Sequence, residues 1–467
     1  THPAFRVYIQ WTRGTPRVEV PREQIYMCEI PDEVELASPA IDAVAVDPHR
    51  GRLALPQGAS AHRVFTTHHY GFAGDLGGGP YERTGSIDEV FAQASWQRGV
   101  SHLEPAVPGV IVPSLRDALD AWNLEPPGRT GVIVVMDSLT DGDTGSPPVI
   151  TVRVPASSRL LIVGARWPVP RVPGRFEPAD IRPHVVGDLI VHGHAGPGER
   201  GRLAINGLLL EGSVIVDAGD LGSLQVTHST IVPGRGEILV QGDNDDLRLD
   251  VSRSITGPIT LVPVITSLAI TDTFVVAPQS LASPDVAIAA TGNDAAIERS
   301  TVWGHVQARV IDASNSIFTA AITAERRQKG CVRFSYVPPG SRTARRHRCQ
   351  PQTAIAASLA AAREAAVANG TEVTAGEQAA LEDTVRRRVV PAFESGRYGE
   401  PDFGLLTPRC AEEIRKGSDT GSSMGGWCFL EEPQREANLV TALDEYLRFG
   451  LQAGVFFVPL PRRKERR

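Results

Sequence analysis

The chain has 467 residues, of which 42% are hydrophobic and 22% are charged, so it can bury a large core. Its 47 Lys and Arg and 54 Asp and Glu give a formal net charge of −7, which excludes the basic excess typical of nucleic-acid-binding proteins. No apolar run reaches the ~20 residues of a transmembrane helix, and the N-terminus lacks the pattern of a secretory signal. We therefore expect no nucleic-acid partner and no membrane span.

Residues 1–90 are predicted to form a small β domain. Apolar and polar residues alternate at 5–9, 44–46, 52–55 and 63–65, and the turns between them include Asp47-Pro48 and residues 56–58. The glycine-rich segment 75–81 follows, but no helix pattern comes after it. Since a phosphate-binding loop opens a helix, we interpret this segment as a close-packed structural turn.

Residues 91–130 are predicted to form a linker and a capping helix. Ser114 is a suitable N-cap, and Leu115, Leu119 and Trp122 follow at helical spacing. Short β-rich segments come next, at 131–138, 149–154 and 160–163. A helix followed by such strands resembles the entry to β-helix proteins of the pectate-lyase and pectin-esterase type, in which the helix covers the open end of the stack.

A repeat supports a mainly β fold built around a right-handed parallel β-helix over residues 131–349. Five segments share an apolar residue, a polar pair, Ser or Thr, and a second apolar residue. The hydroxyl positions are Ser229, Ser254, Thr273, Ser300 and Ser316. They are 25, 19, 27 and 16 residues apart, about 22 on average, as in solenoid repeats. We expect about nine stacked turns, each completing the hydrogen bonds of its neighbours.

The chain changes character after the strand predicted at 331–336. Residues 350–397 are predicted to be a helical insertion with one helix at 354–369 and another that begins at the capping box Thr374-Glu377. Residues 398–467 are predicted to form terminal β-helix coils, with strand-like residues at 403–406, an amphipathic helix at 436–447 and a closing strand at 454–458. A basic tail at 462–467 ends the chain.

Three acidic residues, Asp243, Asp245 and Asp246, are the first candidates for catalysis if the chain is an enzyme. In a polysaccharide lyase such carboxylates would hold Ca²⁺, and in a glycoside hydrolase a pair of them would act as acid and base. The run Asp243-Asn244-Asp245-Asp246 is also a favourable turn between strands, and the same alternatives apply to Asp217 and Asp220. No cofactor is expected, except Ca²⁺ under the lyase hypothesis.

Three histidines and a basic run are further candidates for binding. His192 and His194 lie on one side of a predicted strand, with His184 nearby, and could ligate a metal, although no acidic or thiol partner is close in sequence. Residues 342–348 contain four arginines and a histidine. This run suits an acidic partner surface or a sulfated glycan, or it is a solvated loop.

The five cysteines are spaced in a way that leaves three interpretations open. Cys331 and Cys349 are 18 residues apart, as are Cys410 and Cys428, so each pair could stack on successive turns. Buried thiols, a disulfide and a four-thiolate zinc site all fit this spacing.

Several segments, at 69–72, 75–81, 165–168, 331–341, 433–439 and 443–450, resemble uncharacterised β-helix proteins associated with phage-tail-like (contractile injection) clusters. The resemblance implies a baseplate, spike or surface component whose partners are other subunits of a large assembly. We therefore expect a non-enzymatic structural or binding component in a cytoplasmic assembly or a released particle. The alternative is a carbohydrate-active β-helix enzyme, a tailspike-like lyase or hydrolase, which would bind polysaccharide.

Overall fold

The structure is a computed structural model that describes residues 5–28, 30, 44–47, 52–56, 58–68, 72–142, 148–196, 198–278, 285–448, 450–451 and 453–455. The chain divides into two compact units, Thr1–Phe72 and Ala73–Arg467. The small β domain was predicted from the sequence to end at residue 90, whereas in the structure the first unit ends at Phe72. The segment after Phe72 belongs to the second unit, because it packs on the strands of that unit. Asp47 is described but Pro48 is not, and residues 69–71, 456–458 and 462–467 also lie outside the described part.

The first unit is a small β domain, as predicted. One sheet has the order β2 (Val18–Glu19), β1 (Phe5–Gln10) and β6 (Arg63–His68), with antiparallel pairing. The other has the order β3 (Ile25–Met27), β4 (Val44–Asp47) and β5 (Arg52–Ala54), and a 3-10 helix, η1 (Arg22–Gln24), precedes it. Its core is aliphatic, with Val7, Ile9, Val20, Val44 and Val46 buried.

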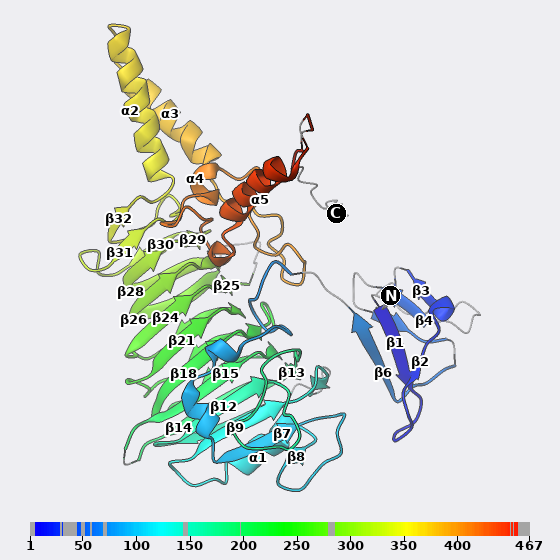
Figure 1. Cartoon of the computed structure of the whole chain (residues 1–467). Coiled ribbons are helices and arrows are strands. Elements are labelled where there is room, and N and C mark those ends of the chain that lie inside the picture. Colours follow the sequence, from blue (N-terminus) through cyan, green and yellow to red (C-terminus); the bar gives the residue numbers. More distant parts are fainter. Residues whose placement is uncertain are drawn as a thin grey trace. The chain divides into compact units, whose positions relative to one another are not determined.

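The second unit is mainly β and contains three long parallel ladders (Figure 1). The first ladder consists of β7 (Trp96–Val100), β9 (Thr130–Val135), β12 (Arg159–Gly164), β15 (Gly201–Asn206), β18 (Leu221–Thr227), β21 (Arg248–Ser252), β24 (Ser267–Thr271), the second halves of β26 (Val286–Glu298) and β28 (His305–Ser314), β31 (Cys331–Arg333) and β32 (Arg345–His347). The short strand β8 (Ile111–Val112) pairs with β7.

The other two ladders take one strand from each turn of the chain as well. The second consists of β11 (Val149–Pro155), β14 (Asp188–His194), β17 (Val214–Val216), β20 (Ile238–Val240), β23 (Ile259–Leu261), the first halves of β26 and β28, and β30 (Ile322–Ala324). The third consists of β10 (Thr140–Asp141), β13 (His184–Val186), β16 (Leu209–Glu211), β19 (Thr230–Ile231), β22 (Ile255–Thr256), β25 (Phe274–Val276), β27 (Thr301–Trp303) and β29 (Ile317–Phe318). This is the arrangement of a solenoid, and it is compatible with a β-helix.

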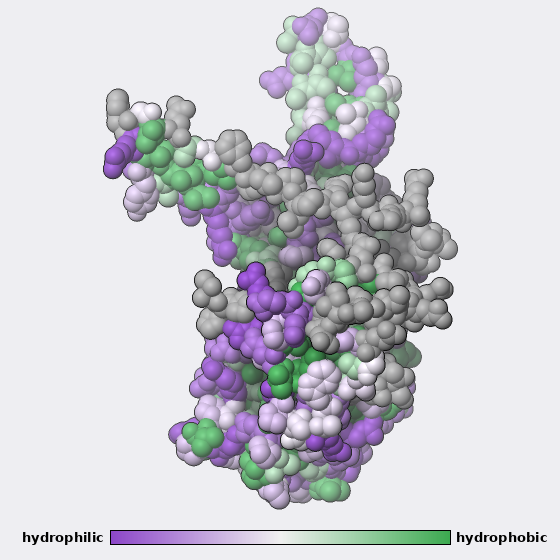
Figure 2. Space-filling model, turned by 90° about the vertical axis from the view of Figure 1, so that its right-hand side faces the viewer, coloured by the Kyte–Doolittle hydropathy of each residue, from purple (hydrophilic) through white to green (hydrophobic). Residues whose placement is uncertain are grey.

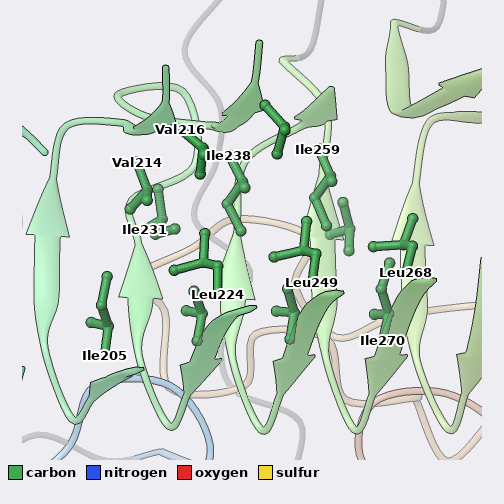
Figure 3. Close-up of a cluster of buried hydrophobic side chains, with 14 of the residues drawn as sticks. Ile205, Val214, Val216, Leu224, Ile231, Ile238, Leu249, Ile259, Leu268 and Ile270 are labelled. Atoms are coloured by element: carbon green, nitrogen blue, oxygen red, sulfur yellow. The ribbon is translucent and has the colours of Figure 1, made fainter. Parts of the chain in front are cut away.

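The interior of the stack is filled by rows of aliphatic side chains. Leu224, Leu249 and Leu268 occupy the same register position on successive strands of the first ladder, and all three are buried. Figure 3 shows them pointing toward Val214, Ile238 and Ile259 of the second ladder. Because one turn cannot bury its inward residues alone, stacking supplies both the dry interior and the hydrogen-bond partners.

The hydroxyl repeat predicted from the sequence forms a buried ladder of its own. The amide of Ser229 donates to Oγ of Ser254 (3.2 Å), and the amide of Ser254 donates to Oγ1 of Thr273 (3.4 Å). The same bond continues through Ser300, Ser316 and Ser335 at 3.1–3.2 Å. The sequence alignment of these turns is therefore confirmed by the pairing.

A left-handed residue precedes each of the six hydroxyls of this ladder and also Cys349, which follows them in the next turn. The residues are His228, Arg253, Asp272, Arg299, Asn315, Phe334 and Arg348, with φ between 45° and 54°. Such a conformation costs a non-glycine residue about 1–2 kcal/mol. The left-handed conformation directs the amide of the residue after it to the hydroxyl in the following turn of the stack. This amide is buried, so a water molecule could not serve as its acceptor instead.

Replacing Ser254 with alanine is expected to lower the free energy of unfolding by about 1–3 kcal/mol. The change leaves the buried amide of Ser229 without its acceptor. The Ser254→Thr variant is the matched control, because Thr273 occupies the equivalent position in the next turn with the same bonds. Urea unfolding of the two variants measures the difference, and equal loss in both would contradict the role of the hydroxyl.

The first turn is covered by α1 (Leu115–Trp122), as predicted. Ser114 caps this helix by accepting a hydrogen bond from the amide of Asp117 (3.1 Å). Leu115, Leu119 and Trp122 are buried, and the ring of Trp122 lies 5.3 Å from that of Trp96 on β7. The helix thus shields the apolar end of the stack from water.

Two glycine-containing segments, one near residue 78 and the other near residue 426, cover the third ladder through equivalent contacts. The amide of Gly78 donates to Oγ1 of Thr230 (2.9 Å), and the amide of Gly426 donates to Oγ1 of Thr301 (3.0 Å). In each case the preceding glycine has a positive φ, and an added Cβ would lie within 2.6 Å of the threonine oxygen. The glycine-rich segment 75–81 is therefore a close-packed turn, as predicted, with η2 (Thr84–Ser86) and η3 (Glu89–Gln93) after it.

The helical insertion is also as predicted: α2 (Gln352–Ala368) and α3 (Ala375–Arg388) form a hairpin, and Thr374 and Glu377 form the capping box. Figure 2 shows both apolar and hydrophilic residues on the visible face of this hairpin. The predicted terminal coils are not seen in the described residues after 397. That part contains α4 (Glu412–Arg415), η4 (Cys428–Leu430) and α5 (Glu432–Tyr446), and Phe403 of the predicted strand is buried against Trp303 and Phe274 instead.

Candidate functional site

The acidic run at Asp243 forms the turn between β20 and β21. Asp243 adopts a left-handed conformation with φ of 63°, and Asn244 is buried. The Asn244 amide nitrogen donates to the carbonyl oxygens of Asp217 (2.9 Å) and Gln241 (3.1 Å), and its Oδ1 accepts from the amide of Leu221 (3.3 Å). The run thus ties one turn of the stack to the turn before it, which is a structural use of these residues.

The carboxylates of this region are joined by an arginine. The Arg200 guanidinium bonds Asp246 at 2.5 Å and also bonds Asp220, so the two acidic runs that the sequence suggested meet at one cation. Asp245 contributes its carbonyl oxygen to a bond from Oγ1 of Thr266 (3.3 Å). The ion pairs with Arg200 are thus a structural use of the Asp246 and Asp220 carboxylates.

The two candidate metal-ligating histidines point outward from β14 at the same edge of the stack. Nδ1 of His192 lies 3.4 Å from Oδ2 of Asp217, and Nδ1 of His194 lies 3.2 Å from the carbonyl oxygen of His192. His184 belongs to a different ladder, where Thr140 and Glu211 contact its ring. Among the residues that the structure describes, no three His, Cys, Asp or Glu side chains are grouped so that they could hold a metal ion.

The cysteine spacing does not produce stacked pairs. Cys331 is in register with Arg345, and Cys349 takes the place of a hydroxyl in the buried ladder, with its thiol 3.2 Å from the carbonyl oxygen of Val332. All five thiols are free. Burial raises the pKa of Cys349 and raises that of Cys428 to about 11, so these thiols stay protonated and packed.

The basic run at 342–348 lies at the end of the stack, and it lines a pocket of about 400 Å³. Residues 341–342 continue the second ladder beyond β30: the amide of Arg342 donates to the carbonyl oxygen of Ile322 (2.8 Å), and the amide of Ala324 donates to that of Arg342 (2.7 Å). The lining residues are Arg327, Ser341, Arg342, Thr343, Ala344, Arg346 and Gln352.

Arg346 has an unusual place in the fold. It is in register with buried Val332, so it stands where the turns from β9 to β31 carry a buried apolar residue, and Arg98 on β7 occupies the same register position at the opposite end of the ladder. Its Nε donates to Oγ1 of Thr343 (2.8 Å), and Nη2 donates to the carbonyl oxygen of Ser341 (2.9 Å). Burial lowers the pKa of this half-buried guanidinium. The stack thus ends in a cationic, polar surface at β32, whereas α1 covers the other end with apolar side chains.

Comparison of the chain with protein-family models, with curated proteins and with solved structures finds no match. The interpretation of the candidate site therefore rests on the geometry of its residues. In the described part of the chain, no helix has the length and apolar content needed to cross a bilayer. Sequence reasoning identified the basic run, but it did not place Arg327 beside it, because loop 325–330 carries no periodic signal that would show where it folds.

A part-buried cluster that the sequence gave no reason to expect joins residues 77–83 to the stack. Nδ1 of His228 lies 2.9 Å from the Tyr81 hydroxyl, which itself donates to the carbonyl oxygen of Gly77. Burial, together with the positive charges of Arg253 and Arg83, lowers the pKa of His228 to about 4. The imidazole is therefore neutral in the folded protein at physiological pH.

This cluster predicts a pH dependence of stability. In the unfolded chain His228 binds a proton as the pH falls below its ordinary pKa of 6.5. In the folded state it binds this proton only at about pH 4. Stability is thus fully present above pH 6.5 and falls by up to about 3 kcal/mol as the pH drops to 4. In the His228→Asn variant, which keeps a residue that tolerates the left-handed turn, this part of the loss should disappear. Urea unfolding of both proteins from pH 7 to 4 tests it, and parallel curves would refute it.

Proposed function

We propose that the second unit is a right-handed parallel β-helix. Support comes from the order in which the chain visits the three ladders, since each full turn from β9 to β30 adds one strand to each of them in parallel register. Crossover connections between parallel strands of one sheet are right-handed in about 98% of cases. Residues 1–72 are a separate β domain in this proposal, and α1 is the cap of the stack.

The function that these features support best is that of a non-enzymatic structural or binding component of a phage-tail-like particle, with the rigid stack as its contact surface. One observation carries this proposal. The end of the stack at β32 presents arginines to solvent, whereas the candidate catalytic residue Asp246 is bound to Arg200. A rigid body with an unneutralised charged end suits recognition of an acidic partner more than bond cleavage.

Isolation of the tagged chain from the cells that encode it, followed by negative-stain imaging, tests the proposal. We expect co-purification with other subunits in a regular particle, in which the chain occupies defined positions. Recovery of a lone monomer from cells that contain assembled particles would contradict it.

A panel of polysaccharides separates this function from the enzyme alternative. We expect no cleavage by the wild-type chain. If cleavage occurred and were lost in the triple variant Asp243→Asn, Asp245→Asn, Asp246→Asn with unfolding unchanged, the chain would be a carbohydrate-active enzyme. If cleavage occurred and survived in that variant, these three residues would not be the catalytic ones, and the non-enzymatic proposal would still fail.

A further inference from the structure

We propose that the pocket at the end of the stack binds a tetrahedral oxyanion, sulfate or phosphate, carried on a sugar. The inference deepens the proposed binding function by naming the chemistry of the ligand. Its test is separate, because ligand binding is measured on the purified chain and particle assembly on the isolated complex.

Three arginines line this pocket, Arg327, Arg342 and Arg346. Within the described residues, none of the three has a carboxylate within the 4.0 Å of an ion pair. Some arginines elsewhere on the stack are paired with carboxylates: Arg309 lies 2.6 Å from Asp294, and Arg299 lies 2.7 Å from Asp272. The pocket is thus a local concentration of positive charge on a chain whose net charge is negative.

The half-buried position of Arg346 strengthens the argument. Two of its nitrogens are held by Thr343 and Ser341, which fixes the plane of the guanidinium, and neither partner carries a negative charge. A desolvated cation is costly unless an anion compensates it. An anion in the pocket would supply that compensation, and it would reverse the effect of burial on the guanidinium.

The N-terminus of α2 provides a second, independent source of positive potential. Gln352, its first residue, lines the pocket. The amides of Thr353 and Ala354 already donate to the carbonyl oxygen of Cys349 (2.9 Å) and to Oε1 of Gln350 (3.1 Å), so the helix contributes through its dipole and not through hydrogen bonds from these amides. The first amides of a 17-residue helix carry a partial positive charge that favours anions.

The size and the lining of the pocket select the class of ligand. Guanidinium groups bind sulfate and phosphate through paired hydrogen bonds, and the Ser341 hydroxyl, which accepts from the amide of Ile322 (3.2 Å), keeps its own proton to donate to a sugar oxygen. The pocket is open to solvent, and its volume of about 400 Å³ leaves room for a sugar beside the oxyanion. A sulfated or phosphorylated sugar unit satisfies both the charge and the volume.

Isothermal titration calorimetry of the full chain tests the inference with four probes: inorganic sulfate, inorganic phosphate, a sulfated disaccharide and its unsulfated counterpart. We expect the sulfated disaccharide to bind more tightly than either inorganic ion, and the unsulfated sugar to bind at least tenfold more weakly than the sulfated one. Binding should weaken as the salt concentration rises.

Matched variants locate the binding. Arg342→Gln removes an exposed cation and should weaken binding of the sulfated disaccharide by about tenfold or more, whereas Arg309→Gln, which removes a cation outside the pocket, should leave it unchanged. Arg346→Gln should weaken binding further. Since Arg346 also packs at the end of the stack, thermal unfolding of each variant shows whether the fold is retained, and Arg342→Gln remains decisive if Arg346→Gln unfolds.

The outcomes are distinct. Tighter binding of the sulfated sugar that depends on Arg342 supports the inference as stated. Binding of the inorganic ions with no gain from the sugar would retain the oxyanion and reject its sugar carrier. No binding of any probe, equal loss in Arg342→Gln and Arg309→Gln, or competition by a polyglutamate peptide alone would overturn the inference.

Discussion

Replacing Arg83 with methionine is expected to lower the free energy of unfolding by about 3–5 kcal/mol. Arg83 is only 2% exposed, and its guanidinium donates to the carbonyl oxygens of Gly79, Tyr81 and Gly164 and to Oδ1 of Asn206. Methionine fills similar space but donates no hydrogen bond, so several buried acceptors lose their donor at once.

Urea unfolding followed by tryptophan fluorescence in a Trp11→Phe background, in which the signal comes from the second unit, gives this value, with Arg129→Met as the matched control. Arg129 makes an exposed pair with Glu125 at 3.4 Å, and its loss should cost at most about 1 kcal/mol. Equal effects of the two substitutions would mean that residues 73–86 are not attached to the stack through Arg83.

Replacing Phe274 with alanine should also cost about 3–5 kcal/mol, by opening a cavity beneath the C-terminal segment. Phe274 is fully buried on the outer side of the third ladder, and its ring centroid lies 5.2–5.5 Å from those of Trp303, Phe403 and Trp427. Gly404 and Gly426 approach the ring so closely that a Cβ on either would collide with it.

Limited proteolysis tests this prediction beside equilibrium unfolding. In Phe274→Ala we expect faster cleavage between residues 390 and 430, because the aromatic contacts attach this segment to the ladder. Tyr446→Ala is the control, since Tyr446 is 88% exposed and its loss should change stability by no more than about 0.5 kcal/mol. Unchanged proteolysis of Phe274→Ala would contradict the assignment.

The parts of the fold that repeat could be predicted from the sequence. Ser229, Ser254 and their equivalents recur because each turn must satisfy the same buried amide, and this physical need leaves a pattern in the residues. The capping helix and the helical hairpin were predicted for a similar reason: Ser114 and Thr374 each cap a helix through local hydrogen bonds.

The parts that cover the stack could not be predicted in this way. Residues 73–93 and 393–430 are held by contacts between residues far apart in sequence, such as Gly78 with Thr230 and Gly426 with Thr301. A pair of glycines indicates a turn but does not identify the surface it meets. The equal spacing of the cysteines suggested stacked pairs, but Cys331 is in register with Arg345. The turns of the stack differ in length, and the turn from Ser335 to Cys349 is short, so equal spacing in sequence does not give equal register.

The candidate residues were found with mixed success. From the sequence, Asp243, Asp245 and Asp246 could be either catalytic residues or part of a turn. The contacts of Asn244 and Arg200 account for the run as a turn that joins successive turns of the stack. The basic run was recognised from its composition. Its inward-facing member, Arg346, could be identified only once the register with Val332 was known.

Disulfide formation between engineered cysteines tests the stacked register most directly, in a Cys28→Ser background. Thr227 and Ser252 are register partners on adjacent strands, with their hydroxyl oxygens 3.3 Å apart, whereas Thr227 and Thr271 are two strands apart, roughly 9.6 Å. Only the first separation is short enough for a disulfide. Mild oxidation should link the Thr227→Cys, Ser252→Cys pair within one chain and leave the Thr227→Cys, Thr271→Cys pair reduced. Efficient linkage of the second pair, or none in the first, would contradict the ladder on which the whole account depends.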